Sequence, residues 1–195
     1  MLSMIKTIIT NVLIALYQPF WFSILITVLF MFLYLYAKEH GWKVVFQKWW
    51  NIFKTSGTFR KLFFLCFYTS LILFRTLLNR NIWANPLSNV MGNWGLYNEY
   101  GQLTTEAIEN FLLFMPFTVL LLWTFPEMIL GESTRVWKIL WKSAKITFLC
   151  SLTIEFAQLL FYLGTFQLSD LCYNTLGGMV GGFFYWVGKK IHRTR

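Results

Sequence analysis

Long apolar runs separated by short polar or basic segments divide this chain. The runs cover residues 8–36, 62–78, 104–125, 146–163 and 169–187. A helix needs roughly 20 apolar residues to cross the hydrocarbon core of a bilayer, so the pattern predicts about five transmembrane helices. The first can begin near residue 8 or only at Pro19. Its apolar run is too long for a cleaved signal peptide and no small-residue cleavage site follows, so we expect a retained helix.

The third run carries signals for a helix start and a kink. Thr104 or Thr105 can cap its first turn, where Glu106 faces the positive end of the helix dipole. Pro116 lies in the middle of the run and predicts a kink there.

The segment 38–61, between the first two runs, is basic and aromatic. Large apolar side chains recur in it at helical spacing, at Trp42, Val45, Phe46, Trp49 and Phe53. Polar residues occupy another face, so residues 42–53 fit a helix that lies in the membrane interface. A loop anchored by tryptophans fits the same residues, and both interpretations remain open.

The amino-acid composition independently indicates a membrane protein. The chain has 195 residues, 57% of them hydrophobic and only 13% charged, with a mean hydropathy of +0.54. A soluble domain carries roughly 25% charged residues, so this chain has too few charges to cover a water-exposed surface. We therefore expect an all-α integral membrane protein, with residues 1–195 forming a single membrane domain.

The net charge of +9 is distributed unevenly. Segments 38–61, 131–145 and 189–195 hold six, four and four Lys or Arg residues, and these fourteen share one side in a five-helix arrangement. Basic loops resist translocation, so the bias predicts an external N-terminus and a cytoplasmic C-terminus. The same bias explains the positive charge without nucleic acid, which we do not expect as a partner.

Polar and ionisable side chains within the apolar runs are the candidate functional residues, because each is costly in lipid. They are Arg75, Glu109, Asn110, Glu155, Gln158, Asp170 and Asn174. In the predicted orientation every one falls in or near the outer half of its helix. We therefore predict an outward-opening polar cavity lined by the second to fifth helices, with Arg75 paired to Glu155 or Glu109.

The last two helices carry further spacing signals. Ser151, Glu155 and Gln158 share one helical stripe. Two small-xxx-small pairs that favour close helix packing follow in the last helix, Gly177 with Gly181 and Gly178 with Gly182. A short turn at Gly164 makes the two helices antiparallel neighbours. From that turn we expect Gln158 level with Asn174, and Glu155 near the level of Gly177 and Gly178.

Each candidate also has a structural interpretation. Asp170 suits a helix N-terminus, where a carboxylate favours the dipole. Asn110, Gln158 and Asn174 can serve only as interhelical hydrogen bonds. Arg75 can extend to the outer headgroups, and Glu155 can form a purely structural salt bridge. The sequence leaves these alternatives open.

Candidate catalytic and metal-binding groups are sparse. Cys66, Cys150 and Cys172 lie in apolar stretches and are odd in number, so they imply no disulfide framework. His40 and His192 have no clustered ligand residues nearby in the sequence, so we expect no metal site and no cofactor. The sequence also shows no nucleophile beside a base, and we assign no catalytic residue.

Four short motifs occur in an order that resembles VanZ-like membrane proteins. Residues 110–117 read NFLLFMPF, similar to the family segment N-x-L-L-F-x-P-F. Ser151, Glu155 and Gln158 resemble the next motif, and residues 170–177 with Gly181 resemble the third. Asn85, Pro86 and Leu87 resemble a weaker fourth motif in the outer loop. The resemblance covers about residues 80–188.

The resemblance implies a multi-pass protein of the bacterial plasma membrane. The name-giving member is associated with low-level resistance to the glycopeptide teicoplanin in Gram-positive bacteria. Family members often have an Arg and an acidic residue before the last helix. Residues 164–169 here read GTFQLS, so both of these residues are missing from this chain.

Three hypotheses follow for the function. The preferred one is a non-enzymatic protein that engages a membrane lipid or lipid-linked envelope precursor at the outer leaflet. The second is an intramembrane enzyme that uses Glu155 and Asp170 as an acid–base pair on a lipid or glycan headgroup. The third is a small lipid transporter, which the lack of an evident internal repeat disfavours. The oligomeric state is open.

Overall fold

The computed structural model describes residues 2–17, 20–36, 42–78, 85–97, 101–131 and 135–193. Helices form nearly all the regular structure of these residues, and an isolated bridge joins Tyr97 to Leu103. The elements are α1 (Leu2–Tyr17), α2 (Phe20–Tyr36), α3 (Trp42–Thr55), α4 (Gly57–Leu73), the π-helical turn η1 (Phe74–Leu78), α5 (Glu106–Thr124), α6 (Pro126–Leu130), α7 (Val136–Phe161) and α8 (Leu168–Arg193).

Three helical segments of the described chain are long and apolar enough to cross a membrane. They are Gly57–Leu77, Glu106–Thr124 and Val136–Phe161. The apolar part of α2 is shorter. The predicted all-α membrane fold is therefore confirmed, whereas the number of spans and the sides on which the termini lie stay predictions.

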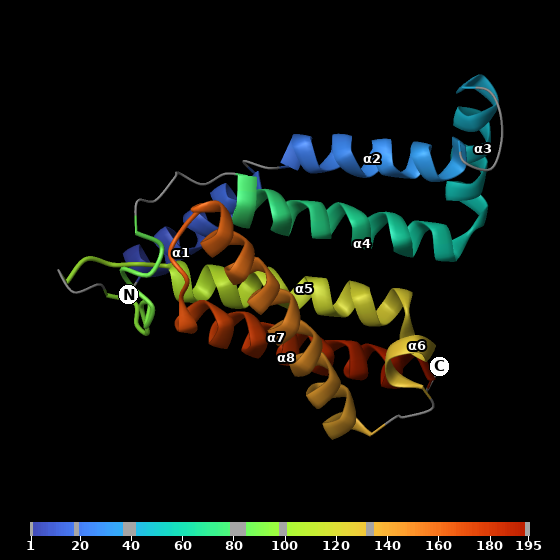
Figure 1. The fold of residues 1–195 in the computed structure, drawn as a ribbon. Coiled ribbons are helices and arrows are strands. Elements are labelled where there is room, and N and C mark those ends of the chain that lie inside the picture. The colour runs from blue at the N-terminus through green and yellow to red at the C-terminus, as the bar shows by residue number, and fades with distance from the viewer. Residues whose placement is uncertain are drawn as a thin grey trace.

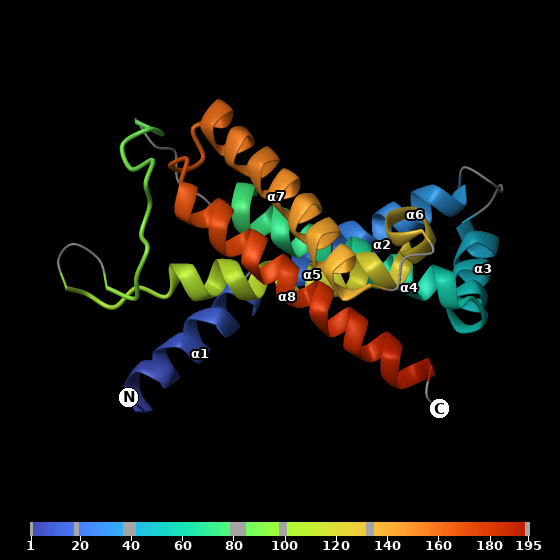
Figure 2. The same cartoon turned by 90° about the horizontal axis from the view of Figure 1, so that it is seen from below.

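The long helices give the bundle two different ends. Helices α2, α4, α5, α7 and α8 run alternately in opposite directions (Figure 1). One end holds α3, α6, the start of α7 and the end of α8, and we call it the basic end because the lysines of these elements gather there. The other end holds residues 85–97 and the turn between α7 and α8, and we call it the polar end (Figures 1 and 2).

The N-terminal apolar run forms two helices rather than one. Helix α2 begins at Phe20, which matches the later of the two predicted starts, and α1 precedes it as a separate helix. Gln18 and Pro19, between them, lie outside the described residues.

Residues 42–55 of the aromatic segment are helical, so the interpretation of residues 42–53 as a loop was wrong. Helix α3 lies across the ends of α2 and α4 (Figures 1 and 2). It buries Val45 and Trp49 against Met31, Leu35 and Phe59. That α3 lies in the membrane interface stays a prediction.

Helix α7 starts at Val136, well before the predicted start at residue 146. The earlier segment 131–145 reads as a loop because of its basic residues. Ile139 is fully buried, however, while the neighbouring Lys138 is exposed. One helical face is therefore apolar enough to continue the helix. Lys138 and Lys145 are exposed, whereas Lys142 donates to the carbonyl oxygen of Ile129 in α6 at 2.6 Å.

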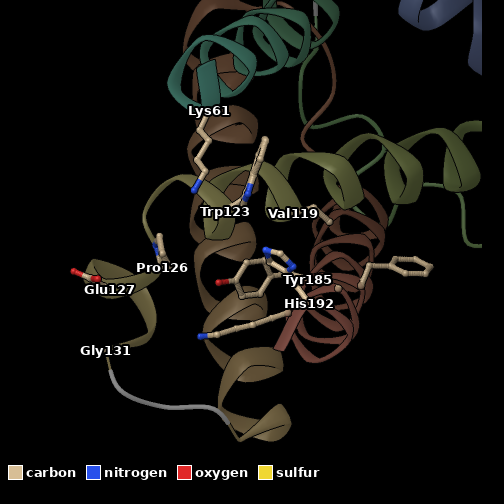
Figure 3. A pocket seen from close by; sticks show the side chains of 11 residues that line it. Lys61, Val119, Trp123, Pro126, Glu127, Gly131, Tyr185 and His192 are labelled. Carbon is tan, nitrogen blue, oxygen red and sulfur yellow. The ribbon is translucent and has the colours of Figure 1, made fainter. Parts of the chain in front are cut away.

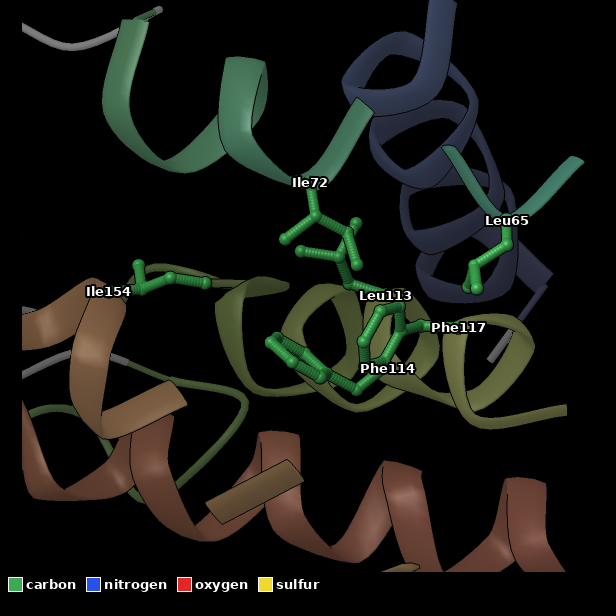
Figure 4. Close-up of a cluster of buried hydrophobic side chains, with 6 residues drawn as sticks. All are labelled: Leu65, Ile72, Leu113, Phe114, Phe117 and Ile154. Carbon is green, nitrogen blue, oxygen red and sulfur yellow. The ribbon is translucent and has the colours of Figure 1, made fainter. Parts of the chain in front are cut away.

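Helix α5 lies at the centre of the bundle. Its Leu113, Phe114 and Phe117 pack with residues of α4 and α7 in the main apolar cluster (Figure 4). The Leu65 and Ile72 side chains reach this cluster from α4. At the basic end, α5 and α8 also border a cavity of about 750 Å³ (Figure 3).

The four paired glycines of α8 (Gly177, Gly178, Gly181 and Gly182) contact two different neighbours. A Cβ atom at Gly177 or Gly181 would overlap the backbone carbonyl of Phe111 or Met115 in α5. A Cβ atom at Gly178 or Gly182 would overlap Thr147 or Ser143 in α7. One small-xxx-small pair thus allows close approach of α5, which runs parallel to α8, and the other allows close approach of the antiparallel α7.

Candidate functional site

The register between α7 and α8 differs from the prediction. The Asn174 side-chain amide donates to Ser151 Oγ at 2.7 Å, and both residues are buried. Gln158, which we expected opposite Asn174, lies two turns further along α7. The two helices are antiparallel, so Asp170 lies one turn from Asn174 toward the polar end, and Glu155 lies one turn from Ser151 in the same direction. Asp170 and Glu155 are therefore at the same level. The expected level of Glu155, near Gly177 and Gly178, was therefore wrong.

The path of residues 162–167 explains this shift. Tyr162 has a left-handed backbone (φ 56°), and the chain reverses there at the end of α7. The segment then returns beside α7, so that Gly164 faces the Gln158 side chain and the Gln167 N–H donates to Glu155 Oε2 at 2.9 Å. Because α8 begins only after this return, its first turn lies beside Glu155 rather than beside the end of α7.

Gln158 and Glu155 are buried and bind backbone groups from other segments. Glu155 is 2% exposed and Gln158 is 3% exposed. Gln158 Nε2 donates to the carbonyl oxygen of Thr76 at 2.8 Å. Thr76 belongs to the π-helical turn η1, a feature that often occurs at functional sites. Neither the π turn nor the roles of Thr76 and Gln167 left a signal in the sequence.

Arg75 occupies the same π turn and pairs with Glu109 of α5. Its Nη2 lies 3.0 Å from Glu109 Oε2, and the two side chains are 30% and 16% exposed. The second oxygen of Glu109 accepts from Thr105 Oγ1 at 2.6 Å. Glu109 is thus one of the two expected partners of Arg75, and Thr105, which sequence reasoning treated as a cap, positions it. Thr104 Oγ1 instead accepts from the Glu106 N–H at 3.4 Å.

Two side-chain amide atoms among the candidate residues at the polar end are buried without a hydrogen-bond partner in the described part of the chain. They are Asn110 Nδ2, a donor, and Asn174 Oδ1, an acceptor. Because Gly177 of α8 lies beside Phe111 of α5 and the helices are parallel, the two asparagines differ in depth by less than a turn. Buried polar atoms are rarely left unbonded, since each costs free energy. The pair therefore suggests a place for a bound polar group or a water.

Residues 85–94 close over the start of α8. The carbonyl oxygens of Pro86 and Val90 accept from the N–H groups of Phe166 and Leu168, both at 2.9 Å. Gly92 has φ +71° and sits so close to Ser169 that a Cβ atom would overlap its hydroxyl. Glycine is therefore required at position 92, where the sequence indicated only a polar loop. The motif at 85–87 therefore lies next to the segment that leads into Asp170.

Asp170 is 6% exposed and lies in the first turn of α8. It shares this buried position with Ser169, which is 1% exposed. A structural role at the helix N-terminus and a role toward a ligand both fit this placement. The cluster at the polar end therefore combines three carboxylates, two of them buried, with three amides and one partly exposed arginine.

The described residues hold no group of three or more His, Cys, Asp or Glu side chains that could bind a metal ion. Cys66, Cys150 and Cys172 are free thiols, each partly buried. The contacts described above give the polar end hydrogen bonds and an ion pair.

The sequence of the chain matches a protein-family profile. The profile of VanZ/LLP1 matches residues 20–189. This match extends further toward the N-terminus than the resemblance seen in the motifs, which covered about residues 80–188. No curated protein and no solved structure matches the chain.

Proposed function

The chain belongs to the VanZ/LLP1 family, and from that premise we propose that it binds a lipid-linked cell-envelope component at the outer leaflet of the bacterial plasma membrane. In this proposal the chain crosses the membrane several times, with the polar end outside. Binding of such a component would give low-level resistance to teicoplanin-type lipoglycopeptides. These antibiotics carry an acyl tail and act on a target at the same leaflet.

The observation that carries this proposal is the incompletely bonded polar cluster inside a lipid-covered bundle. Asn110 offers a buried donor and Asn174 a buried acceptor at similar depth. A ligand that satisfies both must present an acceptor to Asn110 and a donor to Asn174, and sugars and amides carry both kinds of group. A sugar or peptide headgroup on a lipid carrier meets this requirement.

Arg75 supplies the second contact of the proposed site. Glu109 holds its guanidinium at the edge of the cluster, where the arginine side chain remains 30% exposed. A guanidinium in this position binds phosphate oxygens well, because its planar N–H groups match them in geometry and charge. The phosphate of a lipid carrier would therefore contact Arg75, while its headgroup reaches Asn110 and Asn174.

A susceptibility measurement tests the resistance role. A Gram-positive host expressing the chain should tolerate more teicoplanin but no more vancomycin. Asn110→Ala, which removes the unbonded donor of the proposed site, should abolish this tolerance at matched membrane levels, whereas Glu127→Ala, which changes an exposed acid at the basic end, should keep it. A well-expressed wild-type chain with unchanged susceptibility would separate it from this role.

Lipid analysis of the purified chain tests binding directly. We expect an anionic lipid-linked molecule to copurify with the wild type and with Lys138→Ala, but to be lost with Arg75→Ala. A wild-type preparation that retains no lipid, extracted in a mild detergent, would contradict binding.

The shared level of Glu155 and Asp170 favours a second candidate, an intramembrane enzyme that acts on a lipid or glycan headgroup. A pair of carboxyl groups at one level can divide the roles of acid and base in such a reaction. Mass spectrometry of envelope lipids distinguishes the two functions. A covalently altered precursor that disappears with Glu155→Gln and Asp170→Asn would establish the enzyme.

A further inference from the structure

The cavity at the basic end is separate from the proposed outer-leaflet site. Its walls come from α5, α6 and α8, and Lys61 of α4 borders it (Figure 3). Its volume of about 750 Å³ falls in the range of small-molecule binding sites. Val119, Trp123 and Phe184 contribute apolar and aromatic surface to its lining.

The charged groups around this cavity are mostly basic. Two lysines, Lys61 and Lys189, and one acid, Glu127, line it, and His192 adds a neutral polar ring. The Lys61 ammonium lies 5.2 Å from the centre of the Trp123 ring, and this cation–π contact holds it at the cavity. Figure 3 shows the Glu127 carboxylate turned away from Trp123 and His192. The cavity therefore favours an anion.

The lining also favours a hydrocarbon chain. Trp123 is 44% exposed and Phe184 is 52% exposed. In a membrane protein, apolar side chains with this exposure form the surface that contacts lipid. Tyr185, beside them in the cavity, has the amphipathic character typical of residues at the headgroup level. A free phosphate ion would gain nothing from these apolar walls. A phospholipid would contact the basic residues with its phosphate and the apolar walls with its acyl chains.

The geometry points to a binding site for an anionic phospholipid at this cavity. Its phosphate would contact Lys61 and Lys189, and an acyl chain would pack against Phe184 and Val119. Basic pockets between helices on the cytoplasmic side are suited to anionic headgroups. The lipid would tie α4 to α6 and α8 at this end.

Native mass spectrometry of the full chain in a neutral detergent provides the test. Dimyristoyl phosphatidylglycerol should bind about tenfold more tightly than dimyristoyl phosphatidylcholine, and Lys61→Gln with Lys189→Gln should remove about this factor. The control pair Lys43→Gln with Lys138→Gln removes two exposed charges from the same end without touching the cavity. An equal loss with the control pair, or equal affinity for the two lipids, would overturn the proposal.

Gly188→Leu tests the cavity without changing any charge. A Cβ atom at Gly188 would meet no atom within 4 Å, so the larger side chain fits into the cavity it lines. We expect phosphatidylglycerol binding to fall at least tenfold, with an unchanged unfolding temperature in lipid-free detergent. Unchanged binding would overturn the proposal, and displacement of the lipid by millimolar inorganic phosphate would assign the site to a soluble anion instead. Arg75→Ala should leave this binding unaltered, so the two proposed sites can fail separately.

Discussion

The polar and glycine face of the first half of α8 is enclosed by protein, whereas its second half borders an open cavity. Asp170 and Asn174 are at most 6% exposed, and the glycines that follow touch α5 and α7 directly. Beyond Gly182, Phe184 is 52% exposed and Lys189 and His192 are exposed. Polar groups in the first half bond to neighbouring helices, while charged groups in the second half stay at the surface.

This difference shows how one helix can carry two kinds of polar residue in lipid. Amide and carboxyl groups can be buried where glycines allow helices close enough to exchange hydrogen bonds. Lysines are far more costly to bury and remain where aromatic rings and water can stabilise them. The enclosed half should therefore depend on shape and hydrogen bonds, and the open half on charge.

Gly177→Leu should have the largest effect and would break the enclosed half. Its Cβ atom meets the backbone of Phe111, which cannot move aside as a side chain can, so we expect a loss of about 3 kcal/mol or more of stability. Thermal unfolding of the detergent-solubilised chain measures it. Gly188→Leu, in the open half of the same helix, is the matched control and should not destabilise the protein. Equal effects at both positions would refute the contrast.

Glu155→Ala should rank second. It removes the acceptor of the partly buried Gln167 N–H in the return segment, and a donor left unbonded costs up to roughly 1–3 kcal/mol when fully buried. The unfolding temperature should fall clearly for this variant. Glu127→Ala, which changes an exposed acid at the basic end, should leave it nearly unchanged. A similar drop for both would mean that burial of the carboxylate is not what matters.

The Asn174–Ser151 hydrogen bond should contribute less. Double-mutant cycles on hydrogen bonds between membrane helices average about 0.6 kcal/mol and reach about 1.7 kcal/mol. A cycle with Asn174→Ala and Ser151→Ala should give a coupling in this range. The corresponding cycle with Gln158→Ala in place of Ser151→Ala should give none. Coupling to Gln158 instead would restore the register that the sequence predicted.

The Arg75–Glu109 ion pair should show the smallest coupling. Because the arginine side chain is 30% exposed, solvent screening limits the pair to less than about 1 kcal/mol. A double-mutant cycle with Arg75→Gln and Glu109→Gln should give this value, and added salt should reduce it. A salt-independent coupling above that limit would show that the pair is shielded from water.

Several features of the fold and site were predictable because they depend on local composition. The apolar runs determine an all-helical membrane protein, since lipid requires long uncharged helices. The positions of Arg75, Glu155 and Asp170 along their helices place them toward one end, and the basic segments mark the other. Motif order along the chain also identified the family, whose profile matches residues 20–189.

The tertiary structure alone decided how the polar residues meet. The return of residues 162–167 beside α7 shifted the register and brought Asp170 to the level of Glu155. The contact of Gln158 with the Thr76 carbonyl joins groups 82 positions apart and depends on the π turn. Such contacts arise from backbone groups and from the packing of distant segments, which residue type and spacing do not specify. The sequence therefore determined which residues gather at the polar end, and packing determined their partners.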